Sequence, residues 1–312
     1  MPNQSSSTER RRAAIIVNPA SGRARARRRA RKLLYRLVRE GVSAILHETT
    51  GPGDGRKFAA GIAAEVDVVV SVGGDGTLNE VLNGLLDAGS RTPAAVITTG
   101  TANVVAGELG LPPTLPEMVE VIRHGPIRSL DMGLMRAGSG AVRRFAMCAG
   151  AGFDAAVVEA VHRARTGTGI THWSYARPIL STLLRYKHPP LRIAIDGKPL
   201  ERDAVFAVVA NMRRYGGNHQ VCSQADPDDG LFDICCLHKR GMLPLLRLAW
   251  GIVRKNVRPS AEISLLRGKV VELSAAARVP VQADGDAVGI LPMRFEILPA
   301  AAHFCVAAAS PQ

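Results

Sequence analysis

A glycine-rich stretch at residues 71–80, SVGGDGTLNE, combines residue types that can bind a phosphate group. It stands between an apolar run and a run with leucine and valine at helical spacing, so we expect a strand, a glycine turn and a helix. Gly73, Gly74 and Gly76 let the backbone approach a ligand closely, and N–H groups at a helix N-terminus attract anions. Thr77 can cap the helix or bind an oxygen. The stretch has neither the lysine of a P-loop nor the GxGxxG spacing of a dinucleotide fingerprint.

The acid in this stretch, Asp75, needs a separate explanation, because a carboxylate repels phosphate. A bridging cation or a donor hydroxyl would remove the repulsion, and Mg²⁺ is the cation that carboxylate and phosphate oxygens usually share. The alternative is a tight Gly-Asp-Gly turn in which the aspartate caps the helix.

Three further polar loops follow predicted strands in the first part of the chain. Short apolar strands are expected at 13–18, 42–49, 67–72 and 94–98, with helices between them at 23–40, 56–65 and 78–86, and after them near 102–109 and 114–124. Such alternation predicts a parallel, doubly wound sheet, in which ligands bind beyond the carboxyl ends of the strands. The segments at these ends are NPASG, TTGPGDG, GGDGT and TTGTAN.

After about residue 131 the pattern changes to short strands bounded by turns, interrupted by helices near 171–187 and 241–257. The fold class that we predict is therefore α/β plus β, with a nucleotide-binding domain followed by a β-sandwich-like domain. The expected domains are a disordered tail at 1–12, an α/β domain at 13–131 and a β-rich domain at 132–296. The final strand, at about 297–307, is expected to return to the first domain.

The charge of the chain is concentrated in one segment. The net charge of the 312 residues is +13, and the segment from Glu9 to Glu40, with twelve basic and two acidic residues, carries +10 of it. Such a patch fits an anionic membrane or nucleic acid, or is simply a solvated helix face. Because aromatic residues make up only 4% and the rest of the chain is nearly neutral, we do not expect nucleic-acid binding.

The compartment and the mode of membrane contact are inferred from three observations. The five cysteines form no CxxC pair, the N-terminus does not resemble a signal peptide, and no run of 18 apolar residues occurs. We expect reduced thiols, a cytoplasmic protein and, at most, peripheral contact with a membrane. The histidines form no HxH or HExxH pattern, so no zinc site is expected.

Several motifs together resemble the diacylglycerol kinase catalytic family, which includes bacterial soluble lipid kinases and is related to the sphingosine kinases. The resemblance covers nearly the whole chain, although GGDGT alone also occurs in NAD kinases. It rests on NPASG, VGGDGTLNEVLNGL, TTGTANVVAGELGLP, LDMG, FAMCAGAGFDA and RRYGGNHQVCSQADPDDGLFDI. It implies ATP binding between two domains and phosphoryl transfer to a lipid hydroxyl.

The resemblance also implies site residues by position. The nucleotide contacts would be Asn18, Thr49, Gly73, Gly74, Asp75, Gly76, Thr77 and Thr101. A magnesium site, structural or catalytic, would be formed by Asp226, Asp229 and the carbonyl of Leu231. Asp131, in LDMG, is a further catalytic candidate that could polarise the base or the acceptor hydroxyl.

The catalytic base is where this sequence departs from the family. The family has a glutamate in a DGE motif, whereas ADGD at 283–286 has Asp286 there. Aspartate is one methylene shorter, which withdraws the carboxylate by about 1.5 Å, and a misplacement of about 1 Å can cost about 10²-fold in rate. The hypotheses are that Asp286 is the working base, or that the protein is a weakly active nucleotide- and lipid-binding relative. ADGD also reads as a hairpin turn, which could present the base.

The resemblance predicts an ATP- and Mg²⁺-dependent lipid kinase, peripherally bound to a membrane, with diacylglycerol as the default acceptor. A sphingoid base, phosphatidylglycerol or another lipid alcohol remains open as the acceptor, as does the oligomeric state. Two segments, at 170–187 and 242–258, are candidates for lipid contact or for ordinary packed helices. In the second we expect Arg247, Arg254 and Arg258 on one face, with Leu245, Leu246, Ala249 and Val253 across from them.

Overall fold

The computed structural model describes residues 11–22, 25–164, 181–182 and 185–308. The chain divides into two compact units, of which unit 1 comprises Met1–Ser129 and Ala302–Gln312 and unit 2 comprises Leu130–Ala301. The expected tail is described only at its end, where Arg12 already begins a strand.

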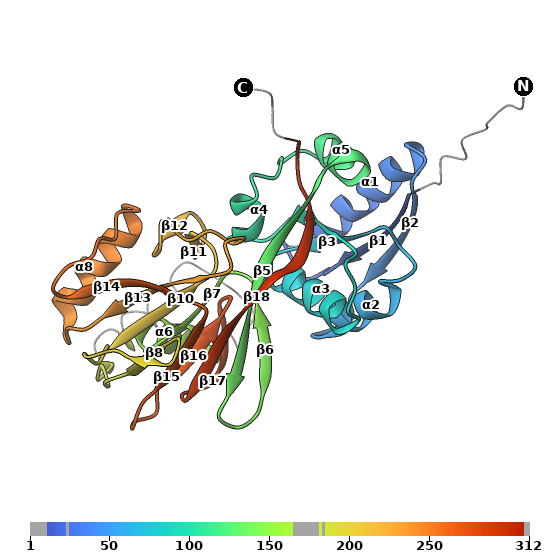
Figure 1. Ribbon diagram of the computed structural model, residues 1–312. Coiled ribbons are helices and arrows are strands. Elements are labelled where there is room, and N and C mark those ends of the chain that lie inside the picture. The colour runs from blue at the N-terminus through green and yellow to red at the C-terminus, as the bar shows by residue number, and fades with distance from the viewer. Residues whose placement is uncertain (1–10, 23–24, 165–180, 183–184, 309–312) are drawn as a thin grey trace, which may run out of the picture. The chain divides into compact units, whose positions relative to one another are not determined.

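Unit 1 alternates strands and helices around a parallel sheet (Figure 1). The strands lie in the order β2-β1-β3-β4, and the last residues of β18 (Met293–Cys305) add to this sheet, with Phe304 parallel to Ala94. The elements are β1 (Arg12–Val17), α1 (Arg25–Arg39), β2 (Ser43–Glu48), α2 (Asp54–Ile62), β3 (Val68–Gly73), α3 (Asp75–Asp87), β4 (Ala94–Thr98), α4 (Val104–Glu108) and α5 (Leu115–His124).

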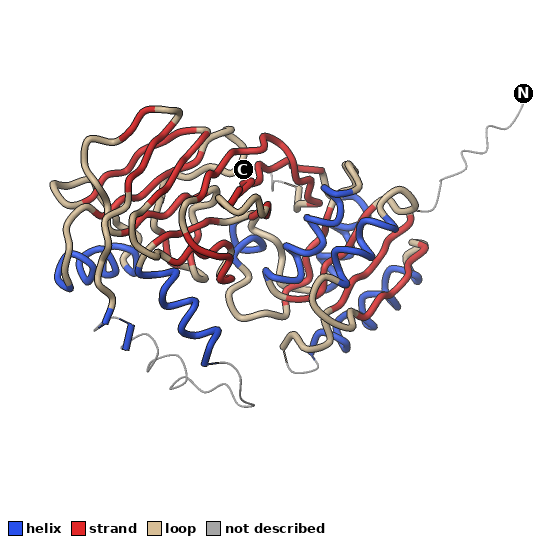
Figure 2. The backbone as a smooth tube through the Cα atoms, turned by 90° about the horizontal axis from the view of Figure 1, so that it is seen from below, coloured by secondary structure: helices blue, strands red, loops and turns tan. Residues whose placement is uncertain are grey.

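Burial on both faces of the sheet explains why these strands are continuous apolar runs. Every residue of β3 is buried. Alternate residues such as Ile15 pack with the apolar sides of α1 and α5, whereas Ile16 faces α2, so that helices cover both faces (Figure 2). The packing holds the carboxyl ends of the strands, and the loops that follow them, at one edge.

Unit 2 is built mainly from two antiparallel sheets (Figure 1), beside which β11 and β12 form a two-stranded sheet. One sheet contains β6-β5-β18-β15-β8-β9 and the other has the order β14-β13-β10-β7-β16-β17. The elements are β5 (Ile127–Ala137), β6 (Val142–Phe145), β7 (Cys148–Ala151), α6 (Phe153–Ala164), β8 (Arg192–Ile195), β9 (Lys198–Pro199), β10 (Phe206–Ala210), β11 (Arg214–Tyr215), β12 (His219–Gln220), β13 (Phe232–Leu237), α8 (Met242–Val253), β14 (Ile263–Gly268), β15 (Val270–Ser274), β16 (Pro280–Ala283), β17 (Asp286–Ile290) and β18.

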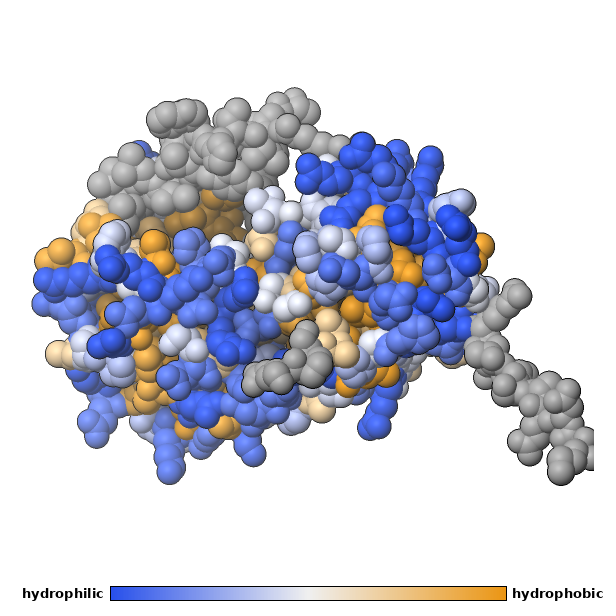
Figure 3. Space-filling view, turned by 90° about the horizontal axis from the view of Figure 1, so that it is seen from above, coloured by the Kyte–Doolittle hydropathy of each residue, from blue (hydrophilic) through white to orange (hydrophobic). Residues whose placement is uncertain are grey.

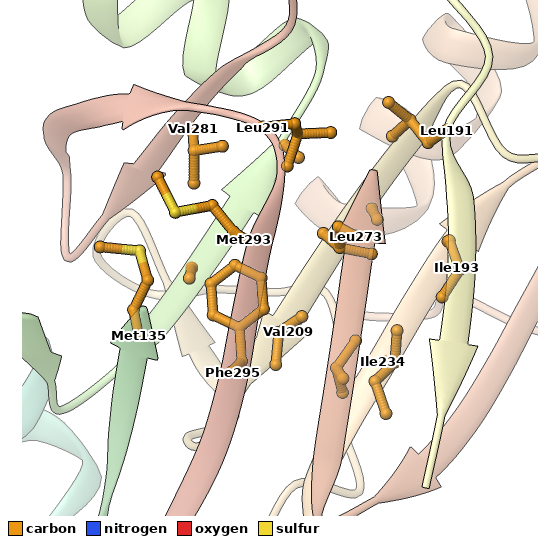
Figure 4. Packing of buried hydrophobic residues seen from close by; sticks show 14 of the residues in the cluster. Met135, Leu191, Ile193, Val209, Ile234, Leu273, Val281, Leu291, Met293 and Phe295 are labelled. Carbon is orange, nitrogen blue, oxygen red and sulfur yellow. The ribbon is translucent and has the colours of Figure 1, made fainter. Parts of the chain in front are cut away.

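The core of unit 2 is formed by apolar side chains from both of its sheets. Figure 4 shows Phe295 of β18 and Leu273 of β15 beside Val209 of β10 and Ile234 of β13. Phe295 is fully buried and meets Phe145 edge to face, with 6.2 Å between ring centroids. This packing makes unit 2 a β-sandwich-like domain.

The predicted fold class is confirmed, because an α/β unit is followed by an antiparallel β-rich unit. Helix α6 was not predicted; it follows β7 after a single residue, Gly152. Of the helix expected near 171–187, most lies outside the described residues. No helix in the described ranges is long and apolar enough to span a membrane.

Candidate functional site

The four loops predicted to bind nucleotide meet at the carboxyl edge of the parallel sheet of unit 1. Asn18 follows β1 and its N–H donates to the Val72 carbonyl over 3.2 Å. Thr49 follows β2, and its backbone N–H donates to the Val17 carbonyl over 2.9 Å. Thr101 belongs to the loop after β4, in which the Thr99 N–H donates to the Gly73 carbonyl over 2.8 Å. Backbone hydrogen bonds thus connect neighbouring loops and bring these predicted residues to the same edge.

Close contacts make glycine necessary at two positions of this edge. A Cβ atom on Gly73 would collide with the side chain of Thr77, and one on Gly100 would lie 2.7 Å from the Cα of Gly74. Thr77 is buried, whereas Gly76 is exposed at the first turn of α3. The edge therefore presents backbone N–H groups and a helix N-terminus, which is the chemistry that receives an anion.

The carboxylate of Asp75 is turned toward the backbone of α4. Its Oδ1 accepts from the Val105 N–H at 3.4 Å, and backbone N–H groups of Asn103 and Val104 also stabilise its charge. Burial is the larger influence, and it raises the pKa of Asp75 above its ordinary value. Asp75 thus joins the start of α3 to the start of α4, and the cation expected beside it stays a prediction.

Two residues that support the edge were not predicted. Both carboxylate oxygens of Glu80 accept from the N-terminus of α2, from the N–H groups of Gly53 (2.8 Å) and Gly55 (3.0 Å). Asn103 adopts a left-handed conformation, and its side-chain amide donates to the Gly100 carbonyl over 2.9 Å. An acid on a helix and an asparagine in a loop carry no sequence signal for such partners.

In unit 2, the predicted magnesium ligands lie in the loop before β13. Asp229 forms an ion pair with Arg267, whose Nε also lies 3.3 Å from Asp233 Oδ2. Burial raises the pKa of Asp233, and the negative charges of Asp229 and Asp226 add to that rise, so three carboxylates share this region. Carboxylates and the Leu231 carbonyl are the hard oxygen donors that Mg²⁺ prefers. Within the described residues, however, no three acidic, histidine or cysteine side chains are arranged to hold a metal.

Asp131 is 2% exposed, and each of its polar groups has a partner inside unit 2. Its two carboxylate oxygens accept from the N–H groups of Gly230 and Ala300, each at 2.7 Å. Its N–H donates to the Pro227 carbonyl, and its own carbonyl accepts from the buried amide of Asn211. Asp131 therefore fixes the loop of the predicted metal ligands to β18.

The two acids of the ADGD turn have different surroundings. Asp284 accepts from the N–H groups of Ala146, Met147 and Cys148 at 2.8 to 3.2 Å, which anchors the turn. Asp286 begins β17 with its side chain 48% exposed, and its Oδ2 lies 2.5 Å from Arg143. Only Asp286 is open to a reactant, and Arg143 fixes where its carboxylate lies.

These contacts predict that substituting the two candidate acids lowers stability by different amounts. In Asp131→Asn, an amide N–H replaces one acceptor oxygen and faces a backbone N–H, so we expect a loss of roughly 1.5–3 kcal/mol in the free energy of unfolding. Asp286→Asn removes one partly exposed ion pair and should cost less than about 1 kcal/mol. Urea unfolding of both variants measures the difference. Equal stability of Asp131→Asn and the wild-type protein would contradict the anchoring role.

The comparisons with known proteins agree with this arrangement. Residues 12–135 match the model of the diacylglycerol kinase catalytic domain, and residues 147–306 match that of the YegS C-terminal NAD kinase beta sandwich-like domain. The chain is 32% identical over 289 residues to a diacylglycerol kinase of Mycobacterium tuberculosis, covering 92% of each chain. It is 27% identical over 286 residues to a diacylglycerol kinase of Bacillus subtilis, covering 91% of this chain and 92% of that protein.

A solved structure shows the same likeness at the level of the fold. The crystal structure of a proposed diacylglycerol kinase from Bacillus anthracis superposes with a TM-score of 0.77 at 25% identity, over 97% of this chain and 99% of that one. With both family models matched in sequence order and a relative above 30% identity along nearly the full length, the chain belongs to the diacylglycerol kinase family and is a phosphotransferase of the lipid-kinase kind.

Proposed function

We propose that this protein transfers the γ-phosphoryl group of ATP to the hydroxyl group of a lipid, with diacylglycerol as the first acceptor to test. The observation that carries the proposal is the meeting of four polar loops at the edge of the parallel sheet, where Gly73 and Gly100 keep side chains out of the way. In this proposal ATP phosphates lie against the first turn of α3, within reach of backbone N–H groups at Gly74, Asp75 and Gly76.

Polar side chains around this edge are proposed to complete the nucleotide site. Asn18, Thr49 and Thr101 follow three different strands, and Thr77 lies in the first turn of α3. Their amide and hydroxyl groups can bond to phosphate or ribose oxygens. Phosphoryl transfer depends mainly on such positioning and on neutralising charge, so a rigid edge suits the reaction.

Asp286 is proposed as the base that receives the proton of the lipid hydroxyl. The acceptor oxygen forms a bond to the γ-phosphorus as the bond between that phosphorus and the bridging oxygen breaks, which releases ADP. The exposed carboxylate can take the proton, and its contact with Arg143 holds it in one orientation. Asp131 is proposed as a positioning residue, because both of its oxygens already accept backbone hydrogen bonds.

Mg²⁺ is proposed as the cofactor, with Asp226, Asp229 and the Leu231 carbonyl as the protein oxygens that would hold it. When bound, the ion supplies positive charge that orders this acidic loop or offsets phosphate charge. Arg267 already provides positive charge to Asp229 and Asp233. The dependence of lipid phosphorylation on added Mg²⁺ tests this assignment, and full turnover in the presence of a chelator would contradict it.

Two alternatives to an efficient diacylglycerol kinase follow from specific features. The acceptor could be a sphingoid base, phosphatidylglycerol or another lipid alcohol, because the lipid itself is not specified by these residues. A weakly active nucleotide- and lipid-binding protein is favoured by the shorter side chain of Asp286 and by its pairing with Arg143.

Substituting Asp286 tests the proposed base. Asp286→Asn cannot accept the proton, so kcat for lipid phosphorylation should fall by roughly 10²- to 10⁴-fold with the fold intact. Asp286→Glu restores the carboxylate at the length found in the family and should retain activity. Glu201→Gln, at an exposed position of the same unit, is the matched control. Turnover of Asp286→Asn at the wild-type rate would remove Asp286 from the mechanism.

Helix α8 is the surface that we propose for peripheral contact with an anionic membrane. Leu243, Leu246, Trp250 and Val253 are exposed and recur at helical spacing, whereas Leu245 and Leu248 are buried. The expected grouping of Leu245 with Leu246 was therefore wrong, and Arg258 lies beyond the end of the helix. Hydrophobic areas interrupt the hydrophilic surface of unit 2 in Figure 3.

An exposed apolar stripe of this kind is unusual on a protein surface and marks a contact site. The guanidinium of Arg254 lies over the ring of Trp250, 5.4 Å from its centroid, which puts a cation beside the apolar stripe. This combination suits the headgroup level of a bilayer. The stripe and the cation therefore support the proposal that the protein binds a membrane peripherally.

Vesicle binding tests the role of α8. The double change Leu246→Ser and Trp250→Ser removes exposed apolar area, so co-sedimentation with vesicles of phosphatidylglycerol and phosphatidylcholine should fall at least tenfold. Stability should be little changed, because neither side chain is buried. Tyr35→Ser, an exposed aromatic on α1, is the control. Unchanged vesicle binding of the α8 variant would contradict the proposed contact.

A further inference from the structure

A groove between α1 and α5 in unit 1 concentrates positive charge. The two helices lie side by side on one face of the parallel sheet (Figure 1), and the groove between them has a volume of about 1170 Å³. This volume is large enough for a small-molecule ligand. Six of the twelve lining residues are basic, and all six belong to α1: Arg27, Arg28, Arg31, Lys32, Arg36 and Arg39.

Helix α1 contains no acidic residue that offsets these charges. Its 15 residues, RARRRARKLLYRLVR, include eight Arg or Lys and no Asp or Glu. Basic residues four positions apart repel each other, and Arg25, Arg27 and Arg28 stand in the first turn, where the helix dipole is already positive. These charges lower the stability of α1, and an anion bound beside the helix would relieve the repulsion.

Part of this charge is balanced within unit 1. Arg27 Nε lies 2.8 Å from one carboxylate oxygen of Glu48, and Arg31 Nη2 lies 3.8 Å from the other. The guanidinium of Arg39 lies over the ring of Tyr35, 5.7 Å from its centroid. Three of the six basic lining residues therefore have a partner already.

The acidic residues that line the groove have partners outside α1. Arg123 lies 3.1 Å from a carboxylate oxygen of Glu40 and 3.3 Å from one of Glu120. The carboxylate of Glu117 accepts a hydrogen bond from the Thr114 hydroxyl. These contacts hold the acids of the groove on residues of α5 and on the residue before it, so they leave the positive charge of α1 in place.

Arg28, Lys32 and Arg36 are the lining cations that remain, because their side chains form no ion pair or hydrogen bond within the part of the chain that the structure describes. All three are exposed, and their spacing of four residues sets them about 6 Å apart along the helix. A guanidinium binds two phosphate oxygens at once, and an ammonium group binds them as a point charge. The row therefore suits an anion that carries several phosphate groups close together.

We propose that the groove between α1 and α5 binds a free, soluble anion with two or more phosphate groups, held by Arg28, Lys32 and Arg36. The cations line a hollow, which admits a small anion, whereas a broad anionic bilayer would also meet the carboxylates of Glu117 and Glu120 on the other wall. The site shares no residue with the proposed nucleotide site. It therefore stands or fails independently of whether the protein phosphorylates a lipid.

Calorimetric titration of the full-length protein with tripolyphosphate tests the site. In a triple variant with Arg28→Gln, Lys32→Gln and Arg36→Gln, the Kd for tripolyphosphate should rise about tenfold or more, because three charge-assisted contacts are lost. Urea unfolding should show no loss of stability for this variant, since the substitutions remove like charges that repel each other. An unchanged Kd would mean that tripolyphosphate binds elsewhere and would overturn the site.

A second triple variant controls for the loss of net charge. Arg192→Gln, Lys198→Gln and Lys269→Gln remove the same charge from exposed positions of unit 2. This variant should bind tripolyphosphate with the Kd of the wild-type protein. An equal rise of Kd in both triple variants would show that net charge alone attracts the anion, and it would overturn the assignment to the groove.

Further probes identify the chemistry of the ligand. Citrate, which carries carboxylates in place of phosphates, should bind about tenfold more weakly than tripolyphosphate, and equal affinity for the two would overturn the assignment to phosphate groups. Single-stranded RNA and phosphatidylglycerol vesicles test two macromolecular ligands. Binding of either that is lost in the α1 variant and retained in the control variant would make the groove a nucleic-acid or membrane surface and would overturn the free anion.

Discussion

The proposed nucleotide site depends on one constraint, which is the lack of room for side chains at the carboxyl edge of the parallel sheet in unit 1. A Cβ on Gly100 would lie too close to the backbone of Gly74, and a Cβ on Gly73 would collide with the side chain of Thr77. Because these points carry no side chains, their backbone N–H groups are open to a ligand. Asp75 and Glu80 use their carboxylates to hold neighbouring loops, so the acids in and beside the glycine stretch shape the edge.

The acidic residues of unit 2 also fall into two groups: those that anchor loops and those whose carboxylate can contact a reactant. The carboxylate oxygens of Asp131 and Asp284 accept hydrogen bonds from backbone N–H groups. The Asp286 side chain is half exposed, and Arg143 is its partner among the contacts described. Neighbouring acids in one short motif can thus differ completely in role. Exposure and hydrogen-bond partners separate them, because a carboxylate already bonded to several N–H groups is a poor proton acceptor.

Much of the fold could be predicted from the sequence, for a physical reason. The run of valines before Gly73 is buried on both sides, and such strands are mostly apolar and β-branched, with Ser71 as the one polar side chain of β3, so their positions are visible from composition. Glycine-rich segments in the sequence predicted the positions of the loops equally well. Helix α6 was missed because it follows β7 almost at once, and the faces of α8 were misjudged because Leu245 and Leu246 are adjacent and differ only in what packs on them.

The support of the site could not be predicted in the same way. The contacts of Glu80, Asn103 and Arg143 join residues that lie far apart in the chain or depend on one backbone angle. Residue types suggest which chemistry is available, and tertiary contacts decide which acids perform it.

Transfer of label from γ-³²P-ATP is the most direct test of the central claim. The purified protein is incubated with diacylglycerol, sphinganine, phosphatidylglycerol and NAD in parallel, with and without Mg²⁺. If the protein is a Mg²⁺-dependent diacylglycerol kinase, a labelled lipid forms only with Mg²⁺ present, and the most label is transferred to diacylglycerol. Labelled NADP, or no labelled lipid from any acceptor, would contradict it.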